Sequence, residues 1–120
     1  MIKFSEEFVV EPEYLRVTTR GEYSFAELFG FIGRIKAEAE AADRDRVLID
    51  SAEIAGILTE ADRFQGGQQV AEVFGGEMKV AWIMPAGQIT KLGEMAAVTR
   101  GADFLVASSE AEALDWLLAD

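Results

Sequence analysis

Several side chains able to bind or react directly follow the apolar runs of this sequence. Asp50 and Ser51 follow the run 46–49, and Gln88 follows the run 78–84. Because the carboxyl ends of parallel strands meet at one edge of a sheet, we expect a ligand- or partner-binding site there. Backbone N–H groups at the helix starts of this edge could also hold an anion. The candidate site residues are Asp50, Ser51, Thr59, Gln88, Ser108 and Ser109.

Catalysis by side chains has few options in this chain. Histidine and cysteine are both absent from the sequence, which excludes a Cys nucleophile, thiolate metal sites and a Ser-His-Asp triad. Asp50 with Glu53 or Asp62 could bind a hard cation, but the sequence has no dense ligand pattern such as a calcium loop. A Ser–Lys pair, for example Ser51 with Lys79, has no supporting motif. We therefore expect no metal, no cofactor and no enzymatic activity.

The six candidate binding residues are also typical turn formers and N-caps. A purely structural role is the simpler interpretation of them.

Length, composition and charge narrow the class of protein. The 120 residues suit one domain, 1–120, and half of them are hydrophobic, so the chain should bury a core. The net charge of −11 repels phosphate backbones and anionic lipids, so we expect no nucleic-acid binding. No apolar run is long enough to cross a bilayer, and the N-terminus lacks the apolar stretch of a signal peptide. We therefore expect a cytoplasmic protein without membrane insertion.

The periodicity of apolar residues predicts alternating strands and helices. The predicted strands are 2–10, 13–20, 46–50, 78–84 and 103–107. The predicted helices are 24–42, 59–74, about 88–100 and a last one that follows Ser109. The order ββαβαβαβα indicates an α/β fold with a mostly parallel five-stranded sheet, an N-terminal hairpin and four helices.

Two of the predicted helices contain glycine pairs in their interior. Gly30 and Gly33 lie in one, and Gly66 and Gly67 lie in the other. Each glycine should cost about 1 kcal/mol relative to alanine. We expect a close approach of the backbone to a neighbour at Gly30 and Gly33, and a bent or broken helix at Gly66 and Gly67. Alternatively, all four mark where the helices stand off or bend and leave an apolar cavity. The large side chains expected mostly in the surrounding core are Phe25, Phe29, Phe31, Phe64, Phe74, Trp82 and Met95.

Three stretches of the chain carry sequence patterns that occur together in a known family. The segment 47–50 is an apolar strand that ends in Asp before a loop. The segment 79–85, which ends in Pro, is followed by Leu-Gly-Glu-Met at 92–95. The strand 104–106 is followed by a capped helix with an Ala-Leu and a Trp-Leu pair at 109–117. In this order, over nearly the whole chain, they resemble the STAS superfamily, in particular its SpoIIAA-like branch of small stand-alone bacterial proteins.

The resemblance implies the SpoIIAA-like (STAS) fold and a possible phosphorylation site. In the anti-sigma-factor antagonists of this superfamily, a serine in an Asp-Ser-x-Gly stretch opens the helix after the third strand, and its phosphorylation switches partner binding. Here the matching stretch, 54–62, lacks that motif, and Thr59 falls near the phosphoacceptor position. A phosphate on Thr59 would meet the negative charges of Glu60 and Asp62, so an N-cap is the simpler interpretation.

The sequence leaves three classes of function open. The first is a non-enzymatic STAS-like regulatory or protein-binding module, which we expect to self-associate as a homodimer through an apolar patch. The second is a carrier or sensor of a small apolar or lipid-like ligand, because this branch also resembles the lipid-binding CRAL-TRIO fold in architecture. The third, and least favoured, is a carboxylate-based hydrolase.

Overall fold

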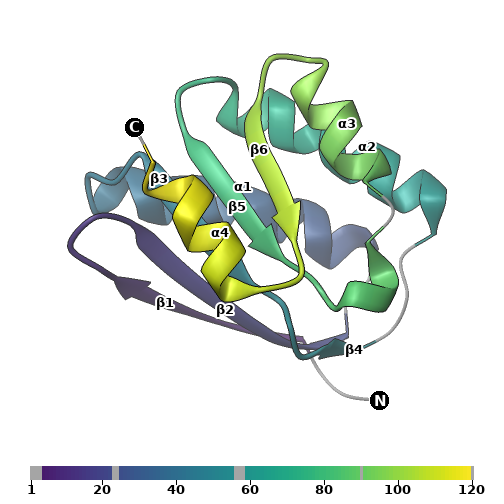
Figure 1. Cartoon of the computed structure of the whole chain (residues 1–120), viewed down its shortest axis with the longest axis horizontal. Coiled ribbons are helices and arrows are strands. Elements are labelled where there is room, and N and C mark those ends of the chain that lie inside the picture. The colour runs from purple at the N-terminus through teal and green to yellow at the C-terminus, as the bar shows by residue number, and fades with distance from the viewer. Residues whose placement is uncertain (1–3, 23–24, 56–58, 90, 120) are drawn as a thin grey trace.

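Strands and helices alternate along the chain in the predicted order (Figure 1). The structure, a computed structural model, describes residues 4–22, 25–55, 59–89 and 91–119. The strands are β1 (Ser5–Val10), β2 (Leu15–Glu22), β3 (Arg46–Asp50), β4 (Ile54–Ala55), β5 (Lys79–Ile83) and β6 (Asp103–Ala107). The helices are α1 (Phe25–Ala41), α2 (Glu60–Phe74), α3 (Leu92–Val98) and α4 (Glu110–Leu117), with a 3₁₀ turn η1 (Ala86–Gln88). The predicted ββαβαβαβα fold is confirmed.

Five strands form the predicted mixed sheet, in the spatial order β1-β2-β3-β5-β6. The hairpin strands β1 and β2 are antiparallel, and every other neighbouring pair is parallel. The two-residue strand β4 pairs with Gly21 and Glu22 at the end of β2. The sequence did not predict β4, because two residues are too short to show a period.

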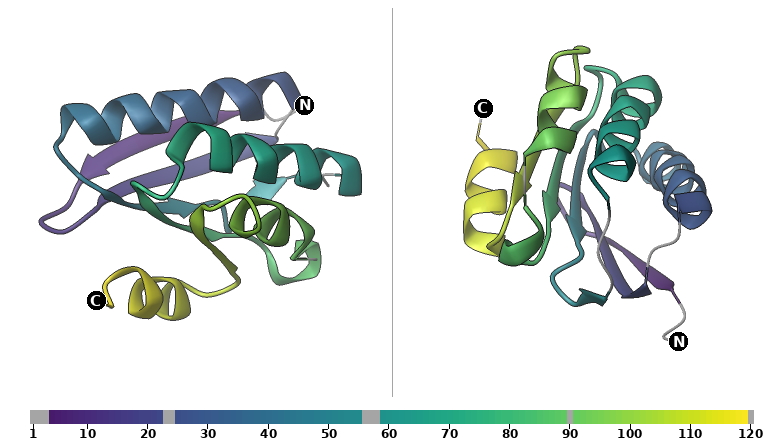
Figure 2. Two further views of the ribbon diagram at one scale, coloured as in Figure 1. Left: turned by 90° about the horizontal axis from the view of Figure 1, so that it is seen from above. Right: turned by 90° about the vertical axis from the view of Figure 1, so that its right-hand side faces the viewer.

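The sheet lies between two helical layers (Figure 2). Helices α1, α2 and α3 cover one face, and α4 alone covers the other. Alternation along β3 sends Val47 and Ile49 to the three-helix side and Leu48 to the α4 side. On β5, Trp82 faces the three-helix side and Ala81 faces the α4 side. Both faces of the central strands are therefore buried, which explains their continuous apolar sequence.

The helix predicted over 88–100 is shorter in the structure. The η1 turn ends at Gln88, and Lys91 has a left-handed backbone conformation with φ of 66°. A left-handed residue cannot continue a right-handed helix, so α3 begins only at Leu92. The Lys91 side chain donates to the Val106 carbonyl on β6, which holds the residue at this break. Within the part of the chain that the structure describes, none of the helices has the length and apolar character of a membrane span.

The interior glycines act differently from the prediction. Helix α2 runs without a break through Gly66 and Gly67, both of which are buried. A Cβ atom on Gly67 would lie 2.2 Å from the Gly93 carbonyl oxygen, so this glycine allows α2 and α3 to approach closely. Gly33 is exposed on α1, with nothing within 4 Å of an added Cβ. Gly30 is exposed too, and only the end of a flexible arginine side chain lies near it, so neither supports a close approach.

Of the seven large side chains expected mostly in the core, Phe31, Phe74 and Trp82 are buried and Phe29 is half-buried. The rings of Phe31 and Trp82 meet edge to face. Phe64 is 37% exposed and Met95 is 60% exposed, so the predicted core position is wrong for both. The side chain of Phe25 lies outside the described residues. The two exposed side chains belong to α2 and α3 and become relevant to function below.

Candidate functional site

The carboxyl ends of the parallel strands meet at one edge of the sheet, as predicted. Asp50 ends β3 and Ser51 follows it, and Ser108 and Ser109 follow β6. The backbone of Gln88 belongs to η1, while its side chain lies outside the described part of the structure. Thr59 immediately precedes α2. The fold therefore brings these segments to the same end of the sheet, but the described side chains among them do not point to one place.

Asp50 and Ser51 point to opposite faces because side chains alternate along a strand. Ser51 is completely buried on the three-helix side of the sheet. Its hydroxyl oxygen lies 2.7 Å from Thr19 Oγ1 and accepts a hydrogen bond of 2.9 Å from the Trp82 indole N–H. Ser51 therefore joins β2, β3 and β5 internally, and this burial argues for a structural role, while its role in binding stays a prediction.

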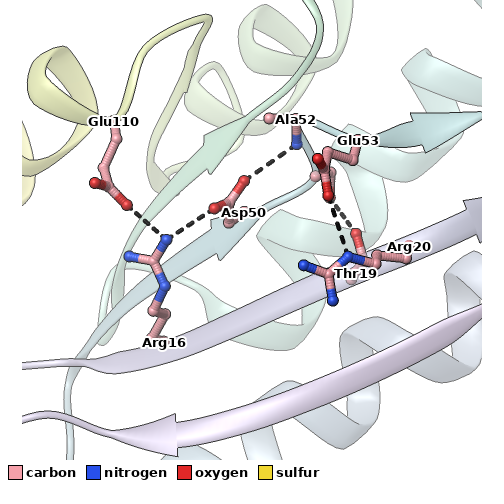
Figure 3. Close-up of polar contacts among 8 residues, drawn as sticks. Arg16, Thr19, Arg20, Asp50, Ala52, Glu53 and Glu110 are labelled. Carbon is pink, nitrogen blue, oxygen red and sulfur yellow. Dashed lines mark hydrogen bonds and ion pairs between the residues drawn. The ribbon is translucent and has the colours of Figure 1, made fainter.

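Asp50 forms an ion-pair network on the α4 side of the sheet (Figure 3). Arg16 on β2 donates to Asp50 Oδ2 at 2.8 Å and contacts Glu110 Oε1, in the first turn of α4, at 2.5 Å. The other carboxylate oxygen of Asp50 accepts from the Ala52 backbone N–H at 3.2 Å. Both Asp50 oxygens are thus engaged, and the network ties the start of α4 to the edge of the sheet.

The charge of Arg16 is stabilised within this network. Partial burial by itself lowers the pKa of Arg16. Hydrogen bonding to Glu110 and the negative charges of Glu110 and Asp50 outweigh that effect, so the pKa is raised above its ordinary value. The guanidinium is charged at every physiological pH, and it balances carboxylates that would otherwise repel each other. Arg16 was not predicted as a site residue, although its sequence signal was a charge between Leu15 and Val17, whose side chains lie buried on the opposite face.

The carboxylates proposed as cation ligands are held apart. Asp50 pairs with Arg16, Glu53 pairs with Arg20 at 3.1 Å, and Asp62 accepts from the Thr59 backbone. Among the described residues, no three carboxylates come together in a group that could hold a metal ion. The arrangement of Asp50 with Glu53 or Asp62, which the sequence analysis left open but did not favour, gains no support from these contacts.

Thr59 is the N-cap of α2, in agreement with the simpler interpretation of its sequence. The Thr59 hydroxyl accepts from the Asp62 N–H at 3.0 Å, and the Asp62 carboxylate accepts from the Thr59 N–H at 3.2 Å. This reciprocal capping box satisfies two backbone donors that a helix start leaves unpaired. Thr59 is also exposed. Its role as a phosphoacceptor stays a prediction.

Replacing Thr59 by alanine should lower the free energy of unfolding by about 1 kcal/mol, because α2 loses its capping hydroxyl. Thr59→Ser keeps the hydroxyl and should stay near the parent. Urea denaturation followed by circular dichroism measures both variants. Equal stability of the alanine and serine variants would contradict the capping role.

Acidic side chains occupy the first turns of the helices at this edge. Glu60 and Asp62 lie in the first turn of α2, and Glu110 and Glu112 lie in that of α4. They already interact favourably with the positive ends of the helix dipoles and would repel a bound anion. Ser109 caps α4 by accepting from the Glu112 N–H at 3.1 Å. These contacts argue for a structural role of Thr59 and Ser109.

A second surface was not predicted as a site. Phe64 on α2 and Met95 and Val98 on α3 are exposed apolar side chains, with exposed fractions of 37%, 60% and 49%. The Arg100 guanidinium lies over the Phe64 ring, 5.2 Å from its centroid, and so links the end of α3 to α2. We call Phe64, Met95, Val98 and Arg100 the α2–α3 face. The sequence carried no signal for this face, because only the docking of α2 and α3 decides which of their apolar side chains stay exposed.

Solved structures of other proteins have an architecture similar to that of this chain. No protein-family model matches the sequence, and no curated protein matches it either. An anti-sigma factor antagonist from Mycobacterium paratuberculosis has a similar structure, with a TM-score of 0.65 at 12% identity, over 98% of this chain and 96% of that one. An uncharacterized protein of the DUF3478 family from Shewanella loihica, described as having a SpoIIAA-like fold, gives 0.58 at 20% identity, over 98% and 95%.

This chain has the SpoIIAA-like fold. Both similar structures are matched over nearly their whole length, so the likeness includes the hairpin, the parallel strands and the C-terminal helix. The identities of 12% and 20% establish the SpoIIAA-like fold alone, because one fold can carry many functions. The expected STAS architecture is thereby confirmed, and function has to be argued from the surfaces of this chain.

Proposed function

We propose that this SpoIIAA-like chain is a non-enzymatic regulatory module that binds another protein through the α2–α3 face. The observation that carries the proposal is the exposure of Phe64, Met95 and Val98 on two neighbouring helices. Aromatic and methionine side chains are enriched in protein interfaces, and neighbouring exposed apolar groups on a folded domain favour burial against a partner.

The charge distribution supports docking at this place. The segments 60–74 and 91–100 contain four acidic and three basic residues, whereas the whole chain has a net charge of −11. The two segments that carry the α2–α3 face are therefore nearly neutral on a strongly acidic molecule. The remaining, acidic surface of this chain would repel an acidic partner, including a second copy of the chain. We accordingly keep the expected homodimer as part of the proposal, with the same face as its contact.

Further support comes from the chemistry of the sheet edge. Asp50 is held by Arg16, and Ser51 is buried, so neither presents a free nucleophile or general base. One similar structure is an anti-sigma factor antagonist, a name that describes opposition to another protein rather than turnover of a substrate. Both points favour binding over turnover, and over the carboxylate-based hydrolase in particular.

Photocrosslinking tests this proposal. With photoreactive benzoylphenylalanine in place of Met95, we expect a specific crosslinked protein in cells of the source organism, because this is the most exposed of the three apolar side chains on the α2–α3 face. The same substitution at Val10, which is 54% exposed on β1, is the matched control and should give none. Mass spectrometry of the product identifies the partner, and joined copies of this chain identify the homodimer.

Competition by unlabelled protein shows whether the crosslink at position 95 depends on binding through the α2–α3 face. Excess unlabelled parent protein should suppress the crosslink at position 95, whereas the Met95→Asp variant should compete at least about tenfold less well, because a charge in an apolar contact costs more than 1.4 kcal/mol. Equal competition by both proteins, or a crosslink at position 10 instead, would overturn the assignment of this face.

A further inference from the structure

An apolar cavity lies on the three-helix side of the sheet, apart from the α2–α3 face. Its volume is about 80 Å³. Leu28 and Ile32 of α1 and Val70 of α2 form its walls, and Trp82 and Phe104 line it from β5 and β6. Apolar cavities stay dry and bind apolar molecules when one of suitable size is present. This cavity therefore has the chemistry of a ligand site.

Gly66 lines the cavity and is not required by packing. A Cβ atom on Gly66 would lie 3.5 Å from Leu28 Cδ2, which is an ordinary contact, whereas one on Gly67 would collide with the Gly93 carbonyl oxygen. Glycine in a helix interior is destabilising relative to alanine. Glycine at position 66 therefore makes the helix less stable than alanine would, and no close contact requires it. Its effect on the structure is that the cavity is larger than it would be with a methyl group at this position.

The charged residues that line the cavity, which we call its rim, indicate which polar group a ligand could carry. Arg63 pairs with Glu60 at 2.8 Å, and Lys91 pairs with Glu94 at 3.1 Å. These rim charges are already balanced, and the whole chain carries a charge of −11, so an anionic group gains little here. A cavity of about 150 Å³ accommodates benzene, so the smaller cavity of this chain suits a narrow chain of a few carbons.

We propose that this cavity binds the alkyl end of a small aliphatic molecule with an uncharged polar group, which remains at the rim between Arg63 and Lys91. The apolar walls exclude water from the alkyl carbons, and the paired rim charges offer hydrogen bonds to a hydroxyl or amide. This site is independent of docking at the α2–α3 face, since it is on the interior side of the helices.

Titration with 1-butanol tests the proposal, since its four-carbon chain suits a cavity that is smaller than one that would admit benzene. The chain has two tryptophans, and Trp116 packs on the α4 side, so Trp116→Phe leaves Trp82 as the reporter inside the cavity. We expect a saturable change in Trp82 fluorescence and a rise in melting temperature with 1-butanol. Pentanoate, with the same butyl chain and a carboxylate, should bind more weakly. A response that is linear in 1-butanol, or absent, would overturn the proposal.

Two matched glycine variants, each in the Trp116→Phe background, separate ligand binding from helix stability. Gly66→Ala adds a methyl group to the cavity wall, so it should raise the melting temperature by a few degrees and weaken 1-butanol binding about tenfold. Gly33→Ala, on the exposed side of α1 with nothing within 4 Å, should give the same stabilisation with unchanged binding. Equal affinity of the two variants for 1-butanol would show that the alkyl chain does not occupy this cavity.

Discussion

Replacing Gly67 by alanine is expected to lower the free energy of unfolding by about 2–3 kcal/mol, although alanine is the better helix former. The added Cβ atom would lie 2.2 Å from the Gly93 carbonyl oxygen and 2.9 Å from the Ala96 Cβ. No side-chain rotation relieves a collision between a Cβ atom and a backbone, so α2 and α3 must move apart. Urea denaturation followed by circular dichroism measures the loss.

Gly66→Ala is the matched control for Gly67→Ala. The two positions are adjacent in α2 and both are buried, but the added Cβ atom at 66 finds an ordinary contact. We expect Gly66→Ala to stabilise the chain by up to about 1 kcal/mol. Neighbouring identical substitutions should thus have opposite signs. If Gly67→Ala were also stabilising, the close contact between α2 and α3 would be absent in solution.

Replacing Ser51 by alanine should destabilise the chain by about 2 kcal/mol. The Trp82 indole N–H loses its acceptor at 2.9 Å, and Thr19 loses a hydroxyl partner at 2.7 Å, in a place that water does not reach. A buried donor left without an acceptor costs about 1–3 kcal/mol. Chemical denaturation measures the effect, and near-ultraviolet circular dichroism reports the environment of Trp82.

Two comparisons isolate the buried hydrogen bond of Ser51. Ser108→Ala removes a hydroxyl from an exposed position and should change stability by less than about 0.5 kcal/mol. The double variant Ser51→Ala with Trp82→Phe lacks both donor and acceptor, so its loss should be smaller than the sum of the single losses. Additive losses would mean that Ser51 and Trp82 do not interact.

Much of the architecture could be predicted because it depends on local patterns. Alternation identified the hairpin strands, and the apolar run 46–50 identified β3 with the same bounds as in the structure. The N-caps Thr59 and Ser109 were recognisable because a cap acts on backbone groups within three residues. The break at Lys91 was missed, since a left-handed residue held by a distant carbonyl leaves no periodic signal.

The candidate site was predicted less well. The sequence analysis placed the right segments at the carboxyl edge of the sheet, but it grouped Asp50 with Ser51 as neighbours. In the structure they lie on opposite faces, one paired with Arg16 and the other buried beside Trp82. These partners lie between 31 and 34 residues away along the chain, and local periodicity carries no information on such pairs.

The sequence by itself determined the order of strands and helices, the burial of the central strands on both faces and the absence of imidazole and thiol chemistry. Those properties follow from backbone preferences and apolar periods over a few residues. Only the tertiary structure decided that Gly67 contacts Gly93, that Met95 faces solvent and that Gly66 borders a cavity. Each of these depends on how helices dock on the sheet, which is set by packing between segments distant along the chain.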